Sequence, residues 1–231
     1  MNEVFRQEQK YFITLMDLMK LSGVLEQVML QDSHNGAWGY RIRSLYFDTP
    51  YEKDYTDKIE GLELRRKIRL RNYDPAAGFA MLEMKQKQGS MQKKRSLRMS
   101  REDAQQLIAG HYTVLQQYEE PFAAECYGVM SQECYRPKTV VEYRRKAFIA
   151  KENKIRVTFD SSIMATETHF DIFSNDLAMS YVLDPYNAVL EVKYNGFMLS
   201  YIKNLLNLSD RSTLSVSKYC LARMSALKFS L

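Results

Sequence analysis

The sequence has 231 residues, of which 45% are apolar and 26% charged, and a formal net charge of +5. This composition favours one folded domain over residues 1–231 and excludes a disordered chain, while the longest apolar runs are too short for a membrane span. Cys126, Cys134 and Cys220 lack the spacing of a zinc site or a disulfide framework. With no apolar signal segment at the N-terminus, we expect a cytoplasmic protein.

The first half of the chain predicts a strand, a helix and then a run of strands. Thr14 and Asp17 form a capping box at the start of the first helix, and Pro50 ends the second strand. Alternating and β-branched residues, interrupted by turn residues, give the element limits. The predicted strands are 4–13, 40–48, 61–73, 79–88 and 91–99, and the predicted helices are 14–29 and 51–59. The last three strands read as an antiparallel meander.

The second half alternates helices with further strands. Ser100 and Asp103 form a second capping box, and Ser217 caps the last helix. The predicted helices are 101–109, 118–133, 197–208 and 217–229, and the predicted strands are 138–150, 154–160 and 188–196. The chain is therefore expected to be an α+β protein with an antiparallel sheet.

Most of these strands combine one charged face with one apolar face. In a strand, residues of equal parity point to the same side. The charged positions are Arg6, Glu8 and Lys10; Arg65, Lys67, Arg69 and Arg71; Glu83, Lys85 and Lys87; Lys93 and Arg95; Lys154, Arg156 and Asp160; and Glu191 and Lys193. Lys and Arg dominate this face, with few carboxylates.

Two interpretations of this face are open. An antiparallel sheet often has one wet side, which would leave these charges in solvent. Alternatively, the helices cover the apolar side and the sheet closes into a barrel, so that the charges line a cavity. Unpaired buried charges are costly, so such a cavity must hold water, metal and an anion. Arginine binds phosphate oxygens in a bidentate manner, and isolated carboxylates suit a divalent cation.

Other candidate sites are weaker. His34, His111 and His169 have no metal-ligand spacing and are expected at the surface, and no Walker A, GxGxxG or Gly-x-Ser-x-Gly motif occurs. The stretch KQKQGSMQKKR, residues 85–95, resembles a nucleic-acid patch, but it lacks the interleaved aromatic residues on which bases stack. We therefore expect no nucleic-acid partner.

Eight segments, in order, resemble one known family. They are RQEQKYFI, SLYFDTP, the run from Lys58 through KIRLRNY, LEMKQK followed by KKR, VVEYRRKAF, KIRVTFD, VLEVKYNG and SKYCLAR, and they extend over about residues 4–224. The chain is similar to the vacuolar transporter chaperone (VTC) polyphosphate polymerase domain, within the CYTH or triphosphate tunnel metalloenzyme superfamily. The resemblance implies an antiparallel β-barrel, or tunnel, with flanking helices.

The resemblance also implies roles for particular residues. Glu191 resembles the metal ligand, for Mn²⁺ or Mg²⁺, and Arg69, Arg71, Glu191 and Lys218 the catalytic set. The expected substrate-binding residues are Lys10, Arg69, Arg71, Lys85, Lys93, Arg145, Arg156, Lys193, Ser217 and Lys218. Strand parity would place Arg144 with Glu142, whereas the family pattern selects Arg145, so a misassigned face or a bulge is expected there.

Some features depart from related patterns. Triphosphatases of the superfamily begin with Glu-x-Glu-x-Lys, whereas Arg6 stands at the first position here. Loss of this carboxylate favours a polymerase over a two-metal hydrolase. Asn72 replaces the Trp that often follows the Arg-Leu-Arg segment in fungal members, which leaves base stacking open.

The predicted function is a metal-dependent ATP:polyphosphate phosphotransferase, a polyphosphate polymerase, with ATP and inorganic polyphosphate as its partners. A bound metal would bridge the ATP phosphates, and positioning with charge neutralisation would lower the barrier. Two alternatives remain: a protein that binds polyphosphate without catalysis, and a triphosphate hydrolase or nucleotide cyclase of the same superfamily. No span is predicted in this chain, and whether a membrane protein is a partner stays open.

Overall fold

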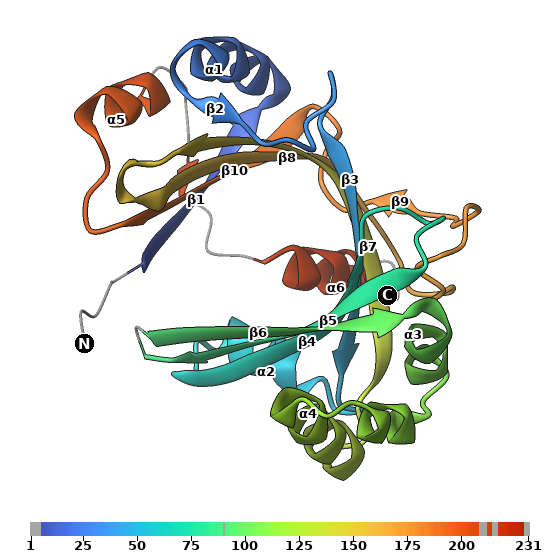
Figure 1. Ribbon diagram of the computed structural model, residues 1–231. Helices are drawn as coiled ribbons and strands as arrows, with labels where there is room; N and C mark the ends of the chain where they lie inside the picture. Colours follow the sequence, from blue (N-terminus) through green and yellow to red (C-terminus); the bar gives the residue numbers. More distant parts are fainter. Residues whose placement is uncertain (1–5, 90, 208–211, 214–216, 229–231) are drawn as a thin grey trace. The chain divides into compact units, whose positions relative to one another are not determined.

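The computed structural model describes residues 6–89, 91–207, 212–213 and 217–228 (Figure 1). These residues form two compact units. Unit 1 contains residues 1–41, 143–163 and 181–216, and unit 2 contains residues 42–142, 164–180 and 217–231, within the described parts of these ranges. The long strands β3 (Tyr40–Asp48), β7 (Arg136–Ala150) and β8 (Ile155–Thr166) contribute residues to both units.

Unit 1 is a sheet with two helices on its apolar face. In the order of hydrogen-bonded neighbours, its strands are β11 (Ser212–Thr213), β1 (Arg6–Thr14), β10 (Asn187–Asn195), β8 and β7, with β2 (Leu30–Gln31) beside β7 and β9 (Ser180–Tyr181) beside β8. Buried Leu190, Val157 and Phe148 on alternate strand positions pack under α1 (Leu15–Val28) and α5 (Ser200–Leu206).

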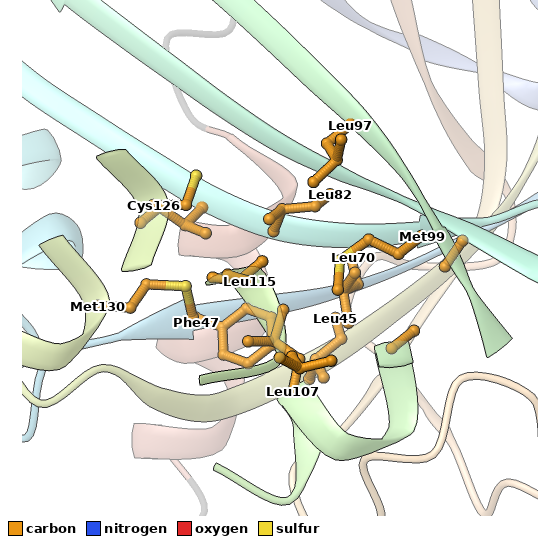
Figure 2. Close-up of a cluster of buried hydrophobic side chains, with 14 of the residues drawn as sticks. Leu45, Phe47, Leu70, Leu82, Leu97, Met99, Leu107, Leu115, Cys126 and Met130 are labelled. Atoms are coloured by element: carbon orange, nitrogen blue, oxygen red, sulfur yellow. The ribbon is translucent and has the colours of Figure 1, made fainter. Parts of the chain in front are cut away.

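Unit 2 is built around the meander of β4 (Leu64–Asn72), β5 (Phe79–Gln88) and β6 (Met91–Ser100), with β3 beside β4 and β7 beside β3. Figure 2 shows its core, in which Leu45, Leu70 and Leu82 from the strands meet Leu107 and Met130 from the helices. The covering elements are α3 (Arg101–Ile108), the 3-10 helix η1 (Tyr112–Gln117) and α4 (Pro121–Gln132). The helices therefore cover the apolar side of the sheet, which leaves the charged side on the opposite face.

In both predicted capping boxes, the side chain of the N-cap residue accepts a hydrogen bond from the backbone N–H three residues later. Thr14 Oγ1 accepts the backbone N–H of Asp17 at 3.1 Å, and Ser100 Oγ accepts that of Asp103 at 3.0 Å. Each bond satisfies one N–H at a helix start, which explains why α1 and α3 begin where the sequence predicted. A further 3-10 turn, η2 (Glu152–Lys154), connects β7 to β8 with Asn153 in the left-handed region at φ 51°.

The predicted fold class, an α+β protein with a large antiparallel sheet and flanking helices, is confirmed. The predicted closure is not seen, because the hydrogen-bonded order of the described strands is an open path from β11 to β6. The ladders within each unit are antiparallel and in regular register, so the alternation of faces is well defined in each.

A buried carboxylate, Asp48, fixes the junction between β3 and the short helix α2 (Lys53–Ile59). Asp48 Oδ1 accepts the N–H of Asp54 at 2.9 Å, and its Oδ2 accepts that of Tyr55 at 3.0 Å. The residue before the helix, Glu52, is in the left-handed region at φ 56° and makes no capping bond through its side chain. Asp48 thus replaces a local N-cap from a distance.

Asp54, at the start of α2, is fully buried close to Asp48. The Tyr135 hydroxyl donates to Asp54 Oδ1 at 3.0 Å, whereas Oδ2 has no hydrogen-bond partner among the described residues. Burial, followed by the negative charge of Asp48, raises the pKa of Asp54 to about 8, against the smaller opposing effects of Tyr135, Arg66 and Lys53.

We predict that Asp54→Asn reduces the pH dependence of stability. The folded protein holds a proton on Asp54 that the unfolded chain releases near pH 4, so this carboxyl destabilises the fold as pH rises from about 4 to about 8, by up to about 1.4 kcal/mol per pH unit. Asparagine cannot titrate, so urea unfolding at pH 5 and pH 7 should give a smaller difference in the variant. Asp176→Asn, at an exposed position, is the control. Equal pH slopes in Asp54→Asn and wild type would contradict the assignment.

Candidate functional site

The charged face of unit 2 brings cations together in rows across three strands. The register places Lys67 opposite Lys85 and Lys85 opposite Lys94, so three ammonium-bearing residues are direct neighbours. Like charges directly opposite one another on a sheet repel, and this repulsion is destabilising. The other rows are Arg71, Met81 and Arg98; Arg69, Glu83 and Ser96; and Arg65, Lys87 and Gln92. We refer to these four rows as the β4–β6 cationic face.

One carboxylate, Glu83, organises the β4–β6 cationic face. Its Oε2 accepts from Arg69 Nε at 2.7 Å and lies 2.6 Å from Arg69 Nη2, while Lys94 Nζ lies 2.5 Å from Oε1. Burial alone would raise the pKa of Glu83, but Arg69, Arg71 and Lys94 lower it to about 2. Glu83 therefore stays ionised and balances only part of the positive charge around it.

Arg71 retains hydrogen-bonding capacity on this face. It is 8% exposed, and its Nε, which is 3.7 Å from Glu83 Oε2, has no hydrogen-bond partner among the described residues. Ser44, directly opposite on β3, is also buried, and its Oγ likewise has no partner within that part of the chain. Buried polar atoms of this kind need a partner, and an anion or a water would supply one.

The predicted face of β6 is wrong by one residue. Leu97 and Met99 are buried in the core, so the odd positions of β6 face the helices, and Arg95 pairs with Glu125 of α4. Lys93 shares this parity and is not on the cationic face, whereas its neighbour Lys94 is. Arg95 can occupy the helix side of the sheet because Glu125 of α4 pairs with it. Lys93 can do so because it lies near the end of the strand, where its side chain is exposed.

In unit 1, lysines and glutamates alternate across β1 and β10. Lys10 lies opposite Glu191, and Glu8 lies opposite Lys193. Lys193 Nζ is 2.6 Å from Glu191 Oε1 and 3.7 Å from Glu8 Oε2, and Lys10 Nζ is 2.7 Å from Glu8 Oε1. The predicted faces of both strands are confirmed for these residues; the side chain of Arg6 lies outside the described part of the structure.

Arg145 joins this cluster from β7. Its guanidinium binds buried Asp160 in a bidentate manner, Nε to Oδ1 at 2.6 Å and Nη2 to Oδ2 at 2.7 Å, and Nη2 is 3.7 Å from Glu191 Oε2. Burial lowers the pKa of Arg145, but Asp160 and Glu191 together hold it well above its ordinary value. Phe148 packs in the core, so even positions of β7 face the helices here and odd ones the charged side. Arg144 therefore lies on the helix side of β7, and the face predicted for it from strand parity was wrong. The alternation from Arg145 to Phe148 is regular, so no bulge is needed there.

Arg156, on β8, lies opposite Lys193 of β10 and is bound by the loop before β3. No role for this loop was predicted from the sequence. Arg156 Nη2 donates to Asp32 Oδ2 at 2.6 Å and to the Tyr40 hydroxyl at 3.3 Å. Asp32 Oδ1 also contacts His34 Nδ1 at 2.9 Å, while the His34 side chain is 77% exposed, in line with its predicted surface position. Nothing in the local sequence of residues 32–40 indicates this pairing, because the partners are 124 positions apart.

The loop before β3 is tied to the backbone of β7. Asn35 Nδ2 donates to the carbonyl of Ala147 at 2.8 Å, and the N–H of Ala147 donates to Asn35 Oδ1 at 3.1 Å. At Gly39, with φ +74°, a Cβ atom would lie 2.2 Å from the carbonyl oxygen of Arg145. Only glycine tolerates both this conformation and this approach.

The predicted capping residue Ser217 and Lys218 stand at the start of α6 (Lys218–Lys228) in unit 2. Ser217 Oγ accepts the N–H of Cys220 at 3.2 Å, which confirms the predicted cap. The next residue, Tyr219, contacts Lys67 of the β4–β6 cationic face and Tyr46 of the neighbouring strand β3. The start of α6 therefore lies at the charged side of unit 2.

The carboxylates of unit 1 can be tested for a divalent cation. No group of three or more His, Cys, Asp or Glu suited to a metal occurs among the described residues. Mg²⁺ usually binds through one or two carboxylates completed by substrate phosphates. Glu191, with Glu8 nearby, fits that pattern if Lys193 releases Oε1 to the cation. The donor set therefore suits a cation that arrives with phosphate.

The predicted residues thus form two clusters, each within one unit. Unit 1 holds Lys10, Arg145, Arg156, Glu191 and Lys193, and unit 2 holds Arg69, Arg71, Lys85, Ser217 and Lys218, with Lys93 on the other side of β6. The two clusters differ in charge balance: in unit 1 each cation lies beside a carboxylate, whereas on the β4–β6 cationic face Glu83 is the one carboxylate among the four rows. No helix in the described ranges is long and apolar enough to cross a membrane.

Comparison with known families identifies the class more closely. The VTC domain family matches residues 5–227, so the chain belongs to the VTC domain family. Among solved structures, a putative adenylyl cyclase from Hippeastrum, HpAC1, described as having a dominant triphosphatase activity, aligns with a TM-score of 0.59 and 14% identity over 94% of this chain and 95% of its own. This likeness shows that the two chains share a fold, and the predicted resemblance to the VTC domain family is confirmed.

Two further structures align less closely. A putative adenylate cyclase from Bacillus halodurans gives a TM-score of 0.49 at 10% identity, covering 88% of each chain. Another from Vibrio parahaemolyticus gives 0.46 at 14% identity, covering 90% of this chain and 87% of its own. No curated protein matches the chain.

Proposed function

We propose that this chain is a metal-dependent polyphosphate polymerase that transfers the γ-phosphate of ATP to a polyphosphate chain. The observation that carries the proposal is the β4–β6 cationic face, on which Lys and Arg side chains surround a single ionised carboxylate, Glu83. A counter-anion of high charge would reduce the repulsion among the cations of this face, and a chain of phosphates supplies such an anion. Membership of the VTC domain family supports the same ligand.

The residues divide the work by their chemistry. Arg69 and Arg71 are planar donors on alternate positions of β4 and suit phosphate oxygens, whereas Lys85 and Lys94 add point charge. The terminal oxygen of the polyphosphate chain would attack the γ-phosphorus as its bond to the β-phosphate oxygen breaks, and ADP leaves. Positioning and neutralisation of charge, rather than covalent chemistry by the protein, lower this barrier.

Glu191, with Glu8, would hold the Mn²⁺ or Mg²⁺ in unit 1, and the metal would neutralise charge on the phosphates. Lys193 and Arg145 already lie beside Glu191, so both are placed to meet phosphate oxygens once a cation takes over the carboxylate. Asp160 keeps the Arg145 guanidinium in one orientation through two hydrogen bonds, which reduces the entropy lost when phosphate binds.

A second candidate is a triphosphate hydrolase. Glu8 and Lys10 share one face of β1 with Glu191 opposite, which preserves part of the Glu-x-Glu-x-Lys pattern, and HpAC1 is described as a triphosphatase. The polymerase is preferred because Arg6 replaces the first carboxylate of that pattern. A protein that binds polyphosphate without catalysis is the third possibility.

The direct test is an incubation of purified protein with ATP labelled at the γ-phosphate and Mn²⁺, followed by gel electrophoresis. We expect a ladder of labelled polyphosphate that disappears when EDTA removes the metal. Free phosphate without a ladder would identify a hydrolase, and labelled ATP left intact, despite tight polyphosphate binding, would identify a binding protein. Either result would overturn the proposed polymerase.

A further inference from the structure

Tyr219, in the first turn of α6, makes one hydrogen bond through its hydroxyl and one stacking contact through its ring, both within unit 2. It is 1% exposed, and its hydroxyl donates to Oδ2 of buried Asp48 at 2.6 Å. The same carboxylate accepts backbone N–H groups at the start of α2. Tyr219 therefore joins α6 to a carboxylate that is already fixed by three backbone donors, those of Thr49, Asp54 and Tyr55.

The ring of Tyr219 continues this connection toward the β4–β6 cationic face. It stacks on Tyr46 with ring centroids 5.1 Å apart and planes inclined by 24°. The Tyr46 hydroxyl in turn accepts a hydrogen bond from Arg69 Nη1 at 3.1 Å, and the Arg69 guanidinium carbon lies 5.8 Å from the Tyr46 ring centre. Lys67 Nζ lies 6.0 Å from the centre of the Tyr219 ring.

These contacts fix two groups at once. Arg69 is held on one side by Glu83 and on the other by Tyr46, so the orientation of its fork depends on where the Tyr46 ring rests. Lys218 directly precedes Tyr219, so its position depends on how α6 is docked. A second anchor holds the middle of α6, where Arg223 pairs with Glu52 and Glu167, neither of which belongs to the cationic face.

We propose that Tyr219 is a positioning residue, which couples the docking of α6 on Asp48 to the orientation of Arg69 and Lys218 toward phosphate. This inference rests on the proposed function. Tyr219 itself need not touch the substrate, because it acts through the Tyr46 ring and through the helix that carries Lys218.

The test uses Tyr219→Phe, with Tyr135→Phe as the matched control. Both tyrosines are buried in unit 2, and each donates one hydrogen bond to a buried aspartate, but Tyr135 contacts Asp54 rather than Asp48. We expect Tyr219→Phe to weaken tripolyphosphate binding, measured by calorimetry, about tenfold, whereas Tyr135→Phe leaves it within about twofold even if both lower the melting temperature. Equal affinities in the two variants would overturn the proposal.

A double-mutant cycle separates positioning from general destabilisation. If Tyr219 acts through Arg69, Tyr219→Phe should cost clearly less affinity in an Arg69→Ala background than in wild type, and the full cost in an Arg66→Ala background. Strict additivity with Arg69→Ala would contradict the coupling.

Hydrogen exchange provides a readout that needs no ligand. Tyr219→Phe should speed amide exchange over residues 218–223, and Tyr135→Phe should not. A wild-type protein that fails to bind tripolyphosphate would overturn the proposed function, and the exchange comparison would then decide by itself whether Tyr219 holds α6. Unchanged exchange in Tyr219→Phe would refute the docking step.

Discussion

Glu191→Gln is expected to abolish phosphoryl transfer while polyphosphate binding stays nearly intact. Both carboxylate oxygens of Glu191 face cations in this structure, Lys193 Nζ at 2.6 Å and Arg145 Nη2 at 3.7 Å. The neutral amide of glutamine is a much weaker ligand for a divalent cation than the Glu191 carboxylate. Because a bound cation contributes several kcal/mol to phosphoryl transfer, turnover should fall by at least about a hundredfold. When binding is measured without metal, loss of one negative charge from a basic cluster cannot weaken the attraction of that cluster for phosphate.

The measurements are the labelled-ladder assay for turnover and calorimetry for tripolyphosphate affinity. Glu26→Gln is the matched control, because Glu26 lies in unit 1 and pairs with Lys146 but sits on the helix side of the sheet. It should retain wild-type turnover. Metal-dependent turnover that persists in Glu191→Gln would rule out Glu191 as the metal ligand.

Arg69→Ala is expected to weaken polyphosphate binding by about 1.5–3 kcal/mol, roughly ten- to 150-fold, as for hydrogen bonds to charged groups. Its guanidinium is oriented by Glu83 and Tyr46 and lies in a field of like charges. Arg69→Lys keeps the charge but loses the planar fork, so a clear loss is expected there too. Removal of an arginine that lies in open solvent would reduce the binding free energy by only about 0–1 kcal/mol, and salt would screen that contribution.

Arg66 is a close control for Arg69. It lies on the same strand but on the opposite face, its side chain is 22% exposed against 21% for Arg69, and it pairs with Glu133. Titrations of wild type, Arg69→Ala, Arg69→Lys and Arg66→Ala at low and moderate salt should separate the two positions. Indistinguishable affinities across all four proteins would mean that the charged face is an ordinary wet surface.

The elements of the meander could be predicted because their patterns are strict. In the middle of β4, Ile68 and Leu70 alternate with Lys67, Arg69 and Arg71, so the two faces differ clearly there, and the structure places Ile68 and Leu70 in the core. The helix starts at Thr14 and Ser100 were equally clear because their caps are local. Whether the sheet closes depends on strands distant in the sequence, and no local pattern encodes that.

Lys93 shows where alternation fails. The run Lys93, Lys94, Arg95 is charged at every position, so both faces look alike and the pattern gives no direction. The signal that resolves it lies further along the strand, where Leu97 and Met99 mark the apolar side. Counting back from them selects Lys94 for the cationic face. For Arg145 the family pattern was a better guide than the neighbouring charges, since Glu142 serves a separate pair with Arg43.

Residues that act through others could not be predicted. Tyr46, Asp48 and Tyr219 belong to segments with the pattern of an ordinary aromatic strand and a helix start, and the hydrogen bond between Tyr219 and Asp48 joins positions 171 apart. Asp32 reads as a loop residue, yet it neutralises Arg156. Such pairings depend on the tertiary fold, and single-sequence periodicity carries no information about them.

The ladder between β1 and β10 has a consequence for synthesis of the protein. Lys10 pairs opposite Glu191, so at about 5–20 residues per second β1 leaves the ribosome roughly 10–40 s before its partner strand exists. The β4–β6 hairpins close locally and need no such wait. An unpaired strand that waits can join another chain, and charged side chains are a common protection against that. Glu8 and Lys10 are therefore expected to reduce aggregation of the nascent chain through β1 during the time in which β10 has not yet been synthesised.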